Sequence, residues 1–143
     1  MATIEQIVED FEFLDDWEDR YRYVIELGRT LDPMPDKDKT DASKVEGCVS
    51  QVWLTHRIEG NGSGDPILFF KGDSDAHIVR GLVAIMLAAC SGKHASDIVD
   101  FDEGALFSKL GLIEHLTPQR ANGLKSMVRR IKSEASAAAA SAA

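Results

Sequence analysis

The sequence has few of the residues that build metal centres and disulfide frameworks. Its 143 residues include two cysteines, Cys48 and Cys90, and neither a C-x-x-C nor an H-E-x-x-H motif. Its four histidines are scattered singly, at His56, His77, His94 and His115. Isolated histidines lack the spacing of metal ligands, and thiols stay reduced in an intracellular protein. We therefore expect neither a structural disulfide nor a metal site.

The chain also lacks a basic excess and a long apolar run. It carries 24 acidic against 16 basic residues, a formal net charge of −8, so nucleic acids and anionic membranes would repel it. The longest strongly apolar stretch, 81–90, is half of the roughly 20 residues that span a membrane. The N-terminus shows no signal-peptide pattern. We expect a cytoplasmic protein, with the dense basic group at 129–132 on a solvated helix face.

Apolar spacing predicts helices toward both ends of the chain. The first covers residues 3–13 with Thr3 as its cap, and the second runs from 17 to about 31 with Asp15 or Asp16 as its cap. Short helices are expected at 95–99 and 103–110, the second ended by Gly111. Thr117 and Pro118 begin a last helix. Its inward stripe is Leu124, Met127, Val128 and Ile131.

The middle of the chain predicts a small sheet and a buried helix. Residues 32–43 form a loop, and residues 45–58 and 67–72 form two strands joined by a flexible turn at 59–66. Residues 73–75 cap a helix that reaches Cys90 and is apolar on nearly all sides, so it is central. Segregated strands and helices predict an α+β fold with helices on one face of a small antiparallel sheet.

The sequence predicts one domain followed by a short tail that has no apolar pattern. Residues 1–134 are enough for one domain with its own core. Residues 135–143 are alanine and serine only, and we interpret them as a C-terminal tail that is either helical or frayed. Cys90, at the end of the central helix, is interpreted as a small buried hydrophobic residue.

Cys48 is the one residue whose position favours chemistry. It lies between Gly47 and a run of strand formers, so it is expected at a junction between a mobile loop and a strand. It has no resolving cysteine two residues away and no neighbouring base, and His56 is about 25 Å along a straight strand. Redox and hydrolase functions are therefore less favoured, a cluster scaffold usually needs more cysteines, and a purely structural role remains open.

The segment around Cys48 resembles the active-cysteine segment of the SufE family, the sulfur acceptors of iron–sulfur cluster assembly. It reads Val45-Glu46-Gly47-Cys48-Val49-Ser50-Gln51-Val52-Trp53. Other segments on both sides of Cys48 also resemble the family and stand in the family's order, across about residues 10 to 132. They are Trp17-Glu18-Asp19-Arg20-Tyr21, Ile25-Glu26-Leu27-Gly28, Gly72-Asp73-Ser74-Asp75-Ala76, Ile78-Val79-Arg80-Gly81-Leu82, His115-Leu116-Thr117-Pro118-Gln119-Arg120 and Gly123-Leu124.

The resemblance implies a SufE/IscU-like fold and a carrier rather than an enzyme. Cys48 would take persulfide sulfur from a SufS- or CsdA-type cysteine desulfurase, raise its turnover and pass sulfur to a SufBCD-type scaffold or another acceptor. Pyridoxal phosphate would belong to the desulfurase, and this chain would need no cofactor. The alternative is a non-enzymatic adaptor that modulates a desulfurase without accepting sulfur. A monomer or a weak homodimer fits either function.

The resemblance also implies loop and partner-binding residues. Gly47 and Gln51 flank Cys48, and Gly47 supplies backbone freedom for a loop that a partner could pull outward. Arg120 would lie in the first turn of the last helix, where a cation opposes the helix dipole unless a carboxylate or a partner offsets it. Asp73 and Asp75 would first serve the helix N-terminus and could also hold the cysteine loop or contact the desulfurase.

Overall fold

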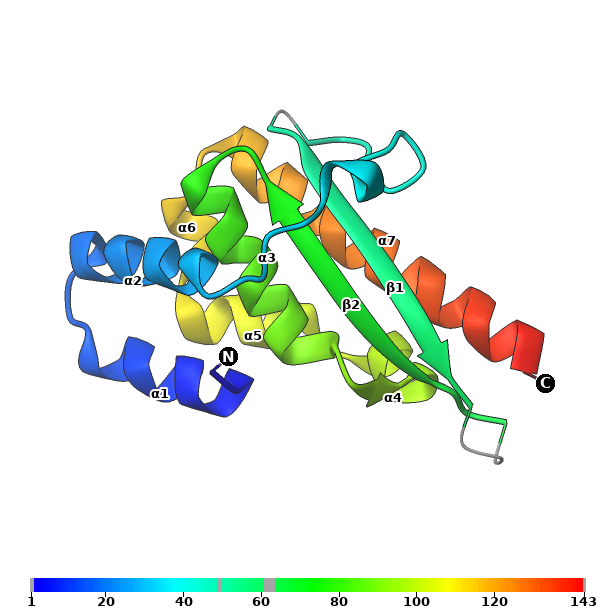
Figure 1. Cartoon of the computed structure of the whole chain (residues 1–143). Helices are drawn as coiled ribbons and strands as arrows, with labels where there is room; N and C mark the ends of the chain where they lie inside the picture. Colours follow the sequence, from blue (N-terminus) through cyan, green and yellow to red (C-terminus); the bar gives the residue numbers. More distant parts are fainter. Residues whose placement is uncertain (1, 49, 61–63, 143) are drawn as a thin grey trace.

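The computed structural model describes residues 2–48, 50–60 and 64–142, and its centre is a three-stranded antiparallel sheet in the order β1-β2-β3. Strand β1 (Val52–Glu59) pairs with β2 (Ile67–Ser74) over its whole length, from Val52 opposite Ser74 to Glu59 opposite Ile67. Strand β3 (Lys93–His94) adds two residues to the other edge of β2. Figure 1 shows the two long strands in front of the helices.

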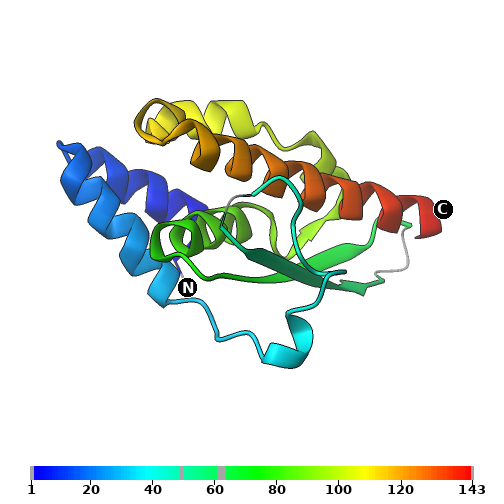
Figure 2. The same ribbon diagram turned by 90° about the horizontal axis from the view of Figure 1, so that it is seen from above.

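The helices lie on one side of this sheet, as Figure 2 shows from above. Helix α3 (His77–Cys90) packs behind β2, with ten of its 14 residues buried, as its apolar sequence predicts. Helices α1 (Ile4–Phe13) and α2 (Trp17–Arg29) precede the sheet. Helices α4 (Ala95–Asp100), α5 (Glu103–Leu110), α6 (Leu112–His115) and α7 (Pro118–Ala142) follow it. The predicted α+β class is therefore confirmed.

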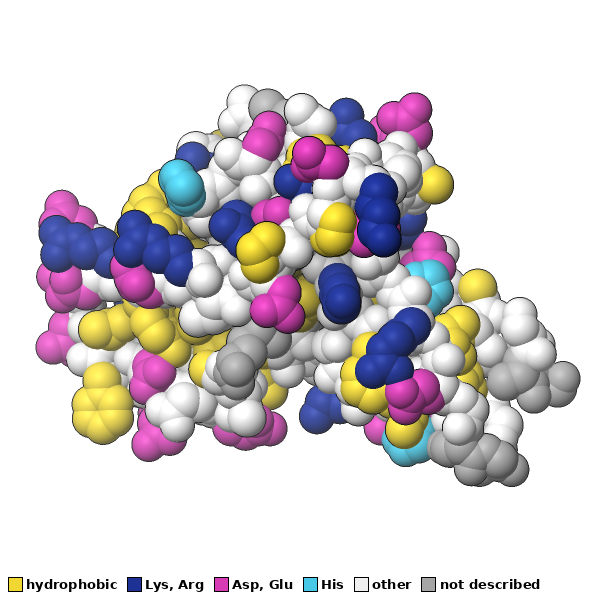
Figure 3. All heavy atoms as spheres, in the orientation of Figure 1, with side chains coloured by type: hydrophobic (Ala, Val, Ile, Leu, Met, Phe, Trp, Pro, Cys, Tyr) yellow, Lys and Arg dark blue, Asp and Glu magenta, His cyan; other side chains and the backbone are white. Residues whose placement is uncertain are grey.

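Along much of β1 and β2, side chains that point to one face of the sheet are buried, whereas those that point to the other face are more exposed. This alternation explains why helices cover only one face of the sheet. Val52, Leu54, Leu68 and Phe70 point toward α3 and α7 and are almost completely buried. On the opposite face the cation of Arg57 lies 4.1 Å from the Phe69 ring centre, and Lys39 lies 5.1 Å from that of Trp53. Figure 3 views this face and shows cations against apolar side chains. Amphipathic side chains thus cover this face in place of a second helical layer.

The close crossing of α2 and α3 depends on two glycines. A Cβ on Gly81 would lie 2.0 Å from the carbonyl oxygen of Val24, and one on Gly28 would lie 2.7 Å from the Gly81 nitrogen. No larger side chain fits either position without moving a backbone. Gly28 is therefore a packing residue of the crossing between α2 and α3.

Local capping chemistry is confirmed at three helices. The Thr3 and Asp16 side chains accept hydrogen bonds from the backbone N–H groups of Gln6 and Asp19. Thr117 accepts from the N–H of Arg120, with Pro118 as the first residue of α7. Gly111 ends α5 with φ of 64°, a left-handed conformation that favours glycine.

Several predicted boundaries were wrong. The stretch from 45 to 58 is not one strand: Glu46 and Gly47 form a turn because Gly47 has φ of 89°, and β1 begins only at Val52. Residues 73–75 do not cap α3, because Asp73 and Ser74 finish β2 and Ala76 precedes the helix without a side-chain cap.

Other differences are additions to the predicted elements. The loop at 32–43 contains a 3-10 turn, η1 (Asp36–Asp38), and the connector after Gly111 is one helical turn. Strand β3 was missed because two residues carry no periodicity. The predicted turn at 59–66 includes 61–63, which lie outside the described residues.

The alanine- and serine-rich tail is helical in this structure. Helix α7 continues without a break past Glu134 to Ala142, and Ala135 and Ala138 are buried against the core. Among the described residues, no helix combines the length and apolar character needed to cross a membrane.

Candidate functional site

The loop that carries Cys48 is closed at its base by backbone contacts. The Val45 N–H donates to the Val52 carbonyl at 2.8 Å, and an isolated bridge joins Lys44 to Trp53. Residues 46–48, 50 and 51 therefore lie in a loop at the start of β1. Cys48 lies within it rather than at the strand itself; its neighbour Val49 lies outside the described residues.

The Cys48 thiol points at the first turns of α7. Its sulfur lies 3.6 Å from the Gly123 carbonyl oxygen, to which the thiol donates a weak hydrogen bond. A Cβ on Gly123 would lie 3.4 Å from the sulfur, in van der Waals contact with it. Gly123 costs helix stability in the interior of α7, and a glycine inside a helical pattern is a sequence signal that could have pointed to a close contact.

A cavity of about 270 Å³ opens beside this thiol. Its apolar wall is formed by Val79, Leu82 and Met127, and its polar rim by Ser50, Thr117, Gln119 and Arg120. Burial raises the pKa of the Cys48 thiol above its usual value. Because a thiolate is the reactive form, the closed loop holds Cys48 in its less reactive, protonated state.

Arg120 is a cation at the rim of this cavity without an ion-pair partner among the described residues. Its Nη1 donates to the Tyr21 hydroxyl at 3.2 Å, so its partner is a neutral phenol and not a carboxylate. A cation in the first turn of a helix is disfavoured by the helix dipole. The Arg120 charge is therefore available to an anion that enters the cavity.

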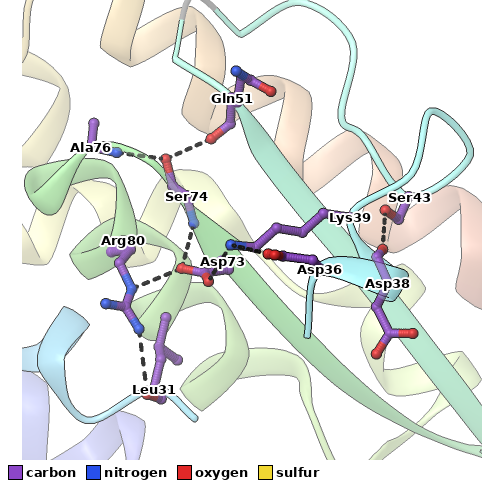
Figure 4. Close-up of polar contacts among 10 residues, drawn as sticks. All are labelled: Leu31, Asp36, Asp38, Lys39, Ser43, Gln51, Asp73, Ser74, Ala76 and Arg80. Atoms are coloured by element: carbon purple, nitrogen blue, oxygen red, sulfur yellow. Dashed lines mark hydrogen bonds and ion pairs between the residues drawn. The ribbon is translucent and has the colours of Figure 1, made fainter. Parts of the chain in front are cut away.

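Gln51, at the far end of the loop, is held by the last residue of β2 and the residue that follows it. The Ser74 hydroxyl donates to the Gln51 carbonyl at 2.7 Å, and the Gln51 N–H donates to the Asp75 carboxylate at 3.1 Å. Figure 4 shows how the Ser74 hydroxyl also accepts from the N–H of Ala76. Asp75 thus contacts the cysteine loop directly, and Ser74, which sequence reasoning did not single out, contacts it more closely.

Asp73 has a different position from Asp75. It is 7% exposed, accepts a hydrogen bond from the Ser74 N–H, and forms ion pairs with Arg80 at 2.8 Å and Lys39 at 3.6 Å (Figure 4). The Arg80 contact is an ion pair rather than an aligned hydrogen bond, since the Nε–H does not point at the carboxylate. Asp73 therefore joins the loop at 32–43, β2 and α3, and it supports the site only through Ser74.

Gly47 is the second loop residue that the sequence singled out. Gly47 has a positive φ, and a Cβ at this position would lie 2.6 Å from the Ser126 hydroxyl oxygen of α7. The loop therefore approaches α7 at two glycines, Gly47 of its own and Gly123 of the helix. Cys90 is outside this site: it is 2% exposed, and burial raises its pKa to about 12.

The comparisons with known proteins place this arrangement in a family. The model of the SufE family, described as an Fe-S metabolism associated domain, matches residues 5–135. The chain belongs to the SufE family. An uncharacterized SufE-like protein of Rhizobium meliloti strain 1021 is 62% identical over 135 residues, covering 94% of this chain and 96% of that protein. One of Rhizobium etli is 58% identical over 140 residues, covering 98% and 94%.

A solved structure supports the fold. The solution structure of a hypothetical protein from Thermus thermophilus matches with a TM-score of 0.69, covering 96% of this chain and 98% of that one. Its sequence identity is 22%, so the likeness concerns the fold alone. SufE membership itself associates the chain with iron–sulfur metabolism.

Proposed function

We propose that this SufE-family protein accepts sulfur on Cys48 from a cysteine desulfurase and carries it as a persulfide. The observation that supports the proposal best is a half-buried thiol beside a cavity whose rim holds the Arg120 cation, which has no ion pair in the described part of the chain. Within the described residues no group of three or more histidine, cysteine or acidic side chains could hold a metal ion. A thiol and a cation that line the same cavity suit sulfur transfer through an anionic persulfide.

The transfer step balances without an added oxidant or reductant. The Cys48 thiol first loses its proton, and its thiolate attacks the outer sulfur of the desulfurase persulfide. The new bond joins Cys48 to that sulfur, the S–S bond of the donor breaks, and the donor cysteine leaves as a thiolate. This is thiol–disulfide exchange with a hydrosulfide as one substituent. Clearing the donor cysteine would raise the turnover of the desulfurase.

The partner controls when this step occurs. In the closed loop the thiol donates to Gly123 and has a raised pKa, so attack is slow. Docking that draws the loop from α7 would expose the sulfur to water and lower its pKa. The Arg120 guanidinium is placed at the cavity rim, where it can stabilise the persulfide anion or anchor a carboxylate of the desulfurase.

The product persulfide then passes to a scaffold complex of the SufBCD type or to another acceptor thiol by the same exchange. Pyridoxal phosphate chemistry belongs to the desulfurase. This chain acts in the proposal as a carrier and an activator, and not as an enzyme.

Intact-protein mass spectrometry tests the proposal. The chain is incubated with a SufS-type desulfurase and cysteine, and we expect a gain of one sulfur atom on Cys48. The Cys48→Ser variant should gain none and should not stimulate the desulfurase, whereas Cys90→Ala should behave as wild type. Stimulation that survives in Cys48→Ser would instead establish an adaptor that accepts no sulfur.

A further inference from the structure

The basic group at 129–132 of α7 divides between two neighbours in the fold. The Arg130 and Lys132 side chains are each only 27% exposed, so they do not form the solvated face that the sequence predicts. Lys132 forms an ion pair with Glu103 at 2.8 Å and donates to the Phe101 carbonyl at 2.6 Å, which ties α7 to the start of α5. Arg130 instead contacts the chain that leads into the cysteine loop.

The Arg130 guanidinium binds two carbonyls of that chain at once. Its Nη2 donates to the Ala42 carbonyl at 2.6 Å, and its Nη1 donates to the Lys44 carbonyl at 3.2 Å. Between them, the Ser43 carbonyl accepts from the N–H of Leu54 at 2.8 Å, so this segment lies between α7 and the edge of β1 (Figure 2). A planar guanidinium holds its donors in fixed directions, and it therefore fixes the segment more closely than a single hydrogen bond would.

Glu134, one turn further along α7, orients this guanidinium. Its Oε1 accepts from the Arg130 Nε at 2.9 Å, and its Oε2 lies 3.5 Å from Nε2 of His56 in β1. Each of the three Arg130 nitrogens thus has a partner, whereas Arg120 has only the Tyr21 hydroxyl. These bonds suit Arg130 to hold the neighbouring chain in place rather than to bind a ligand.

One face of α7 meets the cysteine loop over about three turns. Gly123, Arg130 and Glu134 stand at i, i+7 and i+11, spacings that place side chains on the same side of a helix. At one end of this face the Gly123 carbonyl accepts from the Cys48 thiol, and further along Arg130 binds the segment before the loop. The thiol and the segment that carries it are therefore held by the same helix.

The cysteine loop is thus restrained at both of its ends. After Cys48, Gln51 is bonded to Ser74 and Asp75 at the end of β2. Before Cys48, Arg130 holds the chain from α7. The two restraints come from different elements, so a substitution can remove either one while the other stays.

We propose that Arg130 is a positioning residue for Cys48 and that Glu134 acts through it. While the guanidinium bridges the two carbonyls, the base of the loop stays against α7 and the thiol stays beside Gly123. Without this bridge the base can move from the helix, and solvent reaches the Cys48 sulfur more often. The same restraint sets how easily a desulfurase draws the loop outward, and only this last consequence rests on the proposed function.

Alkylation by iodoacetamide, followed by intact-protein mass, measures access to the thiol. All proteins compared carry Cys90→Ala, so Cys48 is their only thiol. Arg130→Gln should speed alkylation about tenfold, because the two hydrogen bonds that hold the base of the loop are lost. Lys132→Gln is the matched control, since it removes a cation of equal exposure that also binds a carbonyl and a carboxylate. It should lower the free energy of unfolding similarly and leave the alkylation rate unchanged.

Further variants separate the roles of the two residues. Arg130→Lys keeps a cation that can bind one carbonyl but not two in a fixed fork, and it should restore part of the slow alkylation. Glu134→Ala should speed alkylation less than Arg130→Gln does. The double variant should react no faster than Arg130→Gln alone, because Glu134 acts through the arginine. Circular dichroism should show each variant folded.

Alkylation of Arg130→Gln at the rate of its parent, or equal acceleration in Lys132→Gln, would overturn the role of Arg130. Additive effects of the Arg130 and Glu134 substitutions would overturn the dependence of Glu134 on the arginine. No desulfurase takes part in these assays, so sulfur transfer can fail while their outcome stands.

Discussion

The Arg120 side chain is packed against its neighbours, yet its charge has no ion-pair partner in the described part of the chain. Its guanidinium is held by a single neutral partner, Tyr21, at the rim of the cavity that Cys48 lines. A structural arginine would be expected to satisfy its charge with a carboxylate, as Arg80 does with Asp73. Because the described part of the chain offers Arg120 no carboxylate partner, we expect its charge to serve binding rather than stability.

Replacing Arg120 with alanine should therefore reduce stimulation of the desulfurase more than it reduces the free energy of unfolding. The free energy of unfolding should fall by only about 1 kcal/mol, because one hydrogen bond to a phenol is lost. Stimulation of the desulfurase should fall about tenfold or more, which corresponds to a loss of about 1.4 kcal/mol. Arg22→Ala, an exposed arginine of α2, is the matched control and should retain stimulation. A response to the desulfurase that equals wild type would reject the anchoring role.

Gly47 allows a comparison that separates backbone strain from contact with α7. Gly47 and Gly64 both have positive φ, 89° and 81°, but of the two only Gly47 faces an atom of the described residues, the Ser126 hydroxyl. Gly64→Ala should cost about 1 kcal/mol of unfolding free energy through strain alone. Gly47→Ala should cost about 2 to 4 kcal/mol, because overpacking is added. Equal losses in chemical denaturation would show that the loop moves away from α7 at little cost.

At the scale of elements, the connection between β2 and α3 controls the cysteine loop. Ser74, the last residue of β2, and Asp75, the residue after it, bind Gln51, and Asp73 joins the end of the strand to Arg80 and Lys39. The loop is therefore held by the end of one strand and the start of the central helix. Any partner that opens it must break contacts with this connection or turn it as a unit.

Ser74→Ala tests this control. Loss of the hydrogen bonds to Gln51 and Ala76 should lower the unfolding free energy by about 1 to 3 kcal/mol and speed alkylation of Cys48 by iodoacetamide. Ser91→Ala removes a comparable bond, from the Phe70 N–H, far from the thiol in sequence. It should cost similar stability without changing the alkylation rate. Equal alkylation in both variants would mean that Ser74 does not restrain the loop.

The sequence predicted elements where the signal was local. Thr3, Asp16 and Thr117 act on backbone groups three residues away, so their capping could be inferred directly. The role of Asp73 could not be inferred in this way. An aspartate just before a predicted helix fits a helix cap and a buried ion-pair partner equally well. Its partners Lys39 and Arg80 come from different elements, and only the folded chain brings them together.

The candidate site was predictable in its centre but not in its surroundings. Cys48 stood out by resemblance, as did Arg120, yet the contacts with Gly123 and Tyr21 join residues 75 and 99 positions apart. No periodicity carries such information. The start of β1 was misplaced because Val45 and Val52 both favour strands, while the turn between them depends on the positive φ of Gly47.

At the scale of the whole molecule, α3 connects every layer through its buried surface. Cys90 ends this helix in the common core, and burial raises the pKa of its thiol from 9.0 to about 12. The folded state therefore holds this proton more tightly than the unfolded chain. The stabilisation is fully present below pH 9 and is lost as the pH rises from 9 toward 12.

Denaturant unfolding at several pH values should reveal this loss. Above about pH 9 the wild-type chain should lose about 1.4 kcal/mol per pH unit more than a Cys90→Ala variant, in which no thiol ionises at this position. Below about pH 8 the difference between the two proteins should be constant, since both states of the chain keep the proton. Parallel pH profiles up to about pH 11 would show that the Cys90 thiol is not protected by the core.

The backbone contact that closes the cysteine loop also limits how far its sulfur can travel. Cys48 stands three residues from Val45, which is bonded to Val52 at the loop's base. Three extended residues reach about 10 Å at most, so the sulfur stays within roughly that radius while the base holds. In the proposed transfer, a donor would have to bring its own sulfur to this small volume. The selection of partners would then depend on the length and shape of the donor's arm as much as on the affinity of its surface.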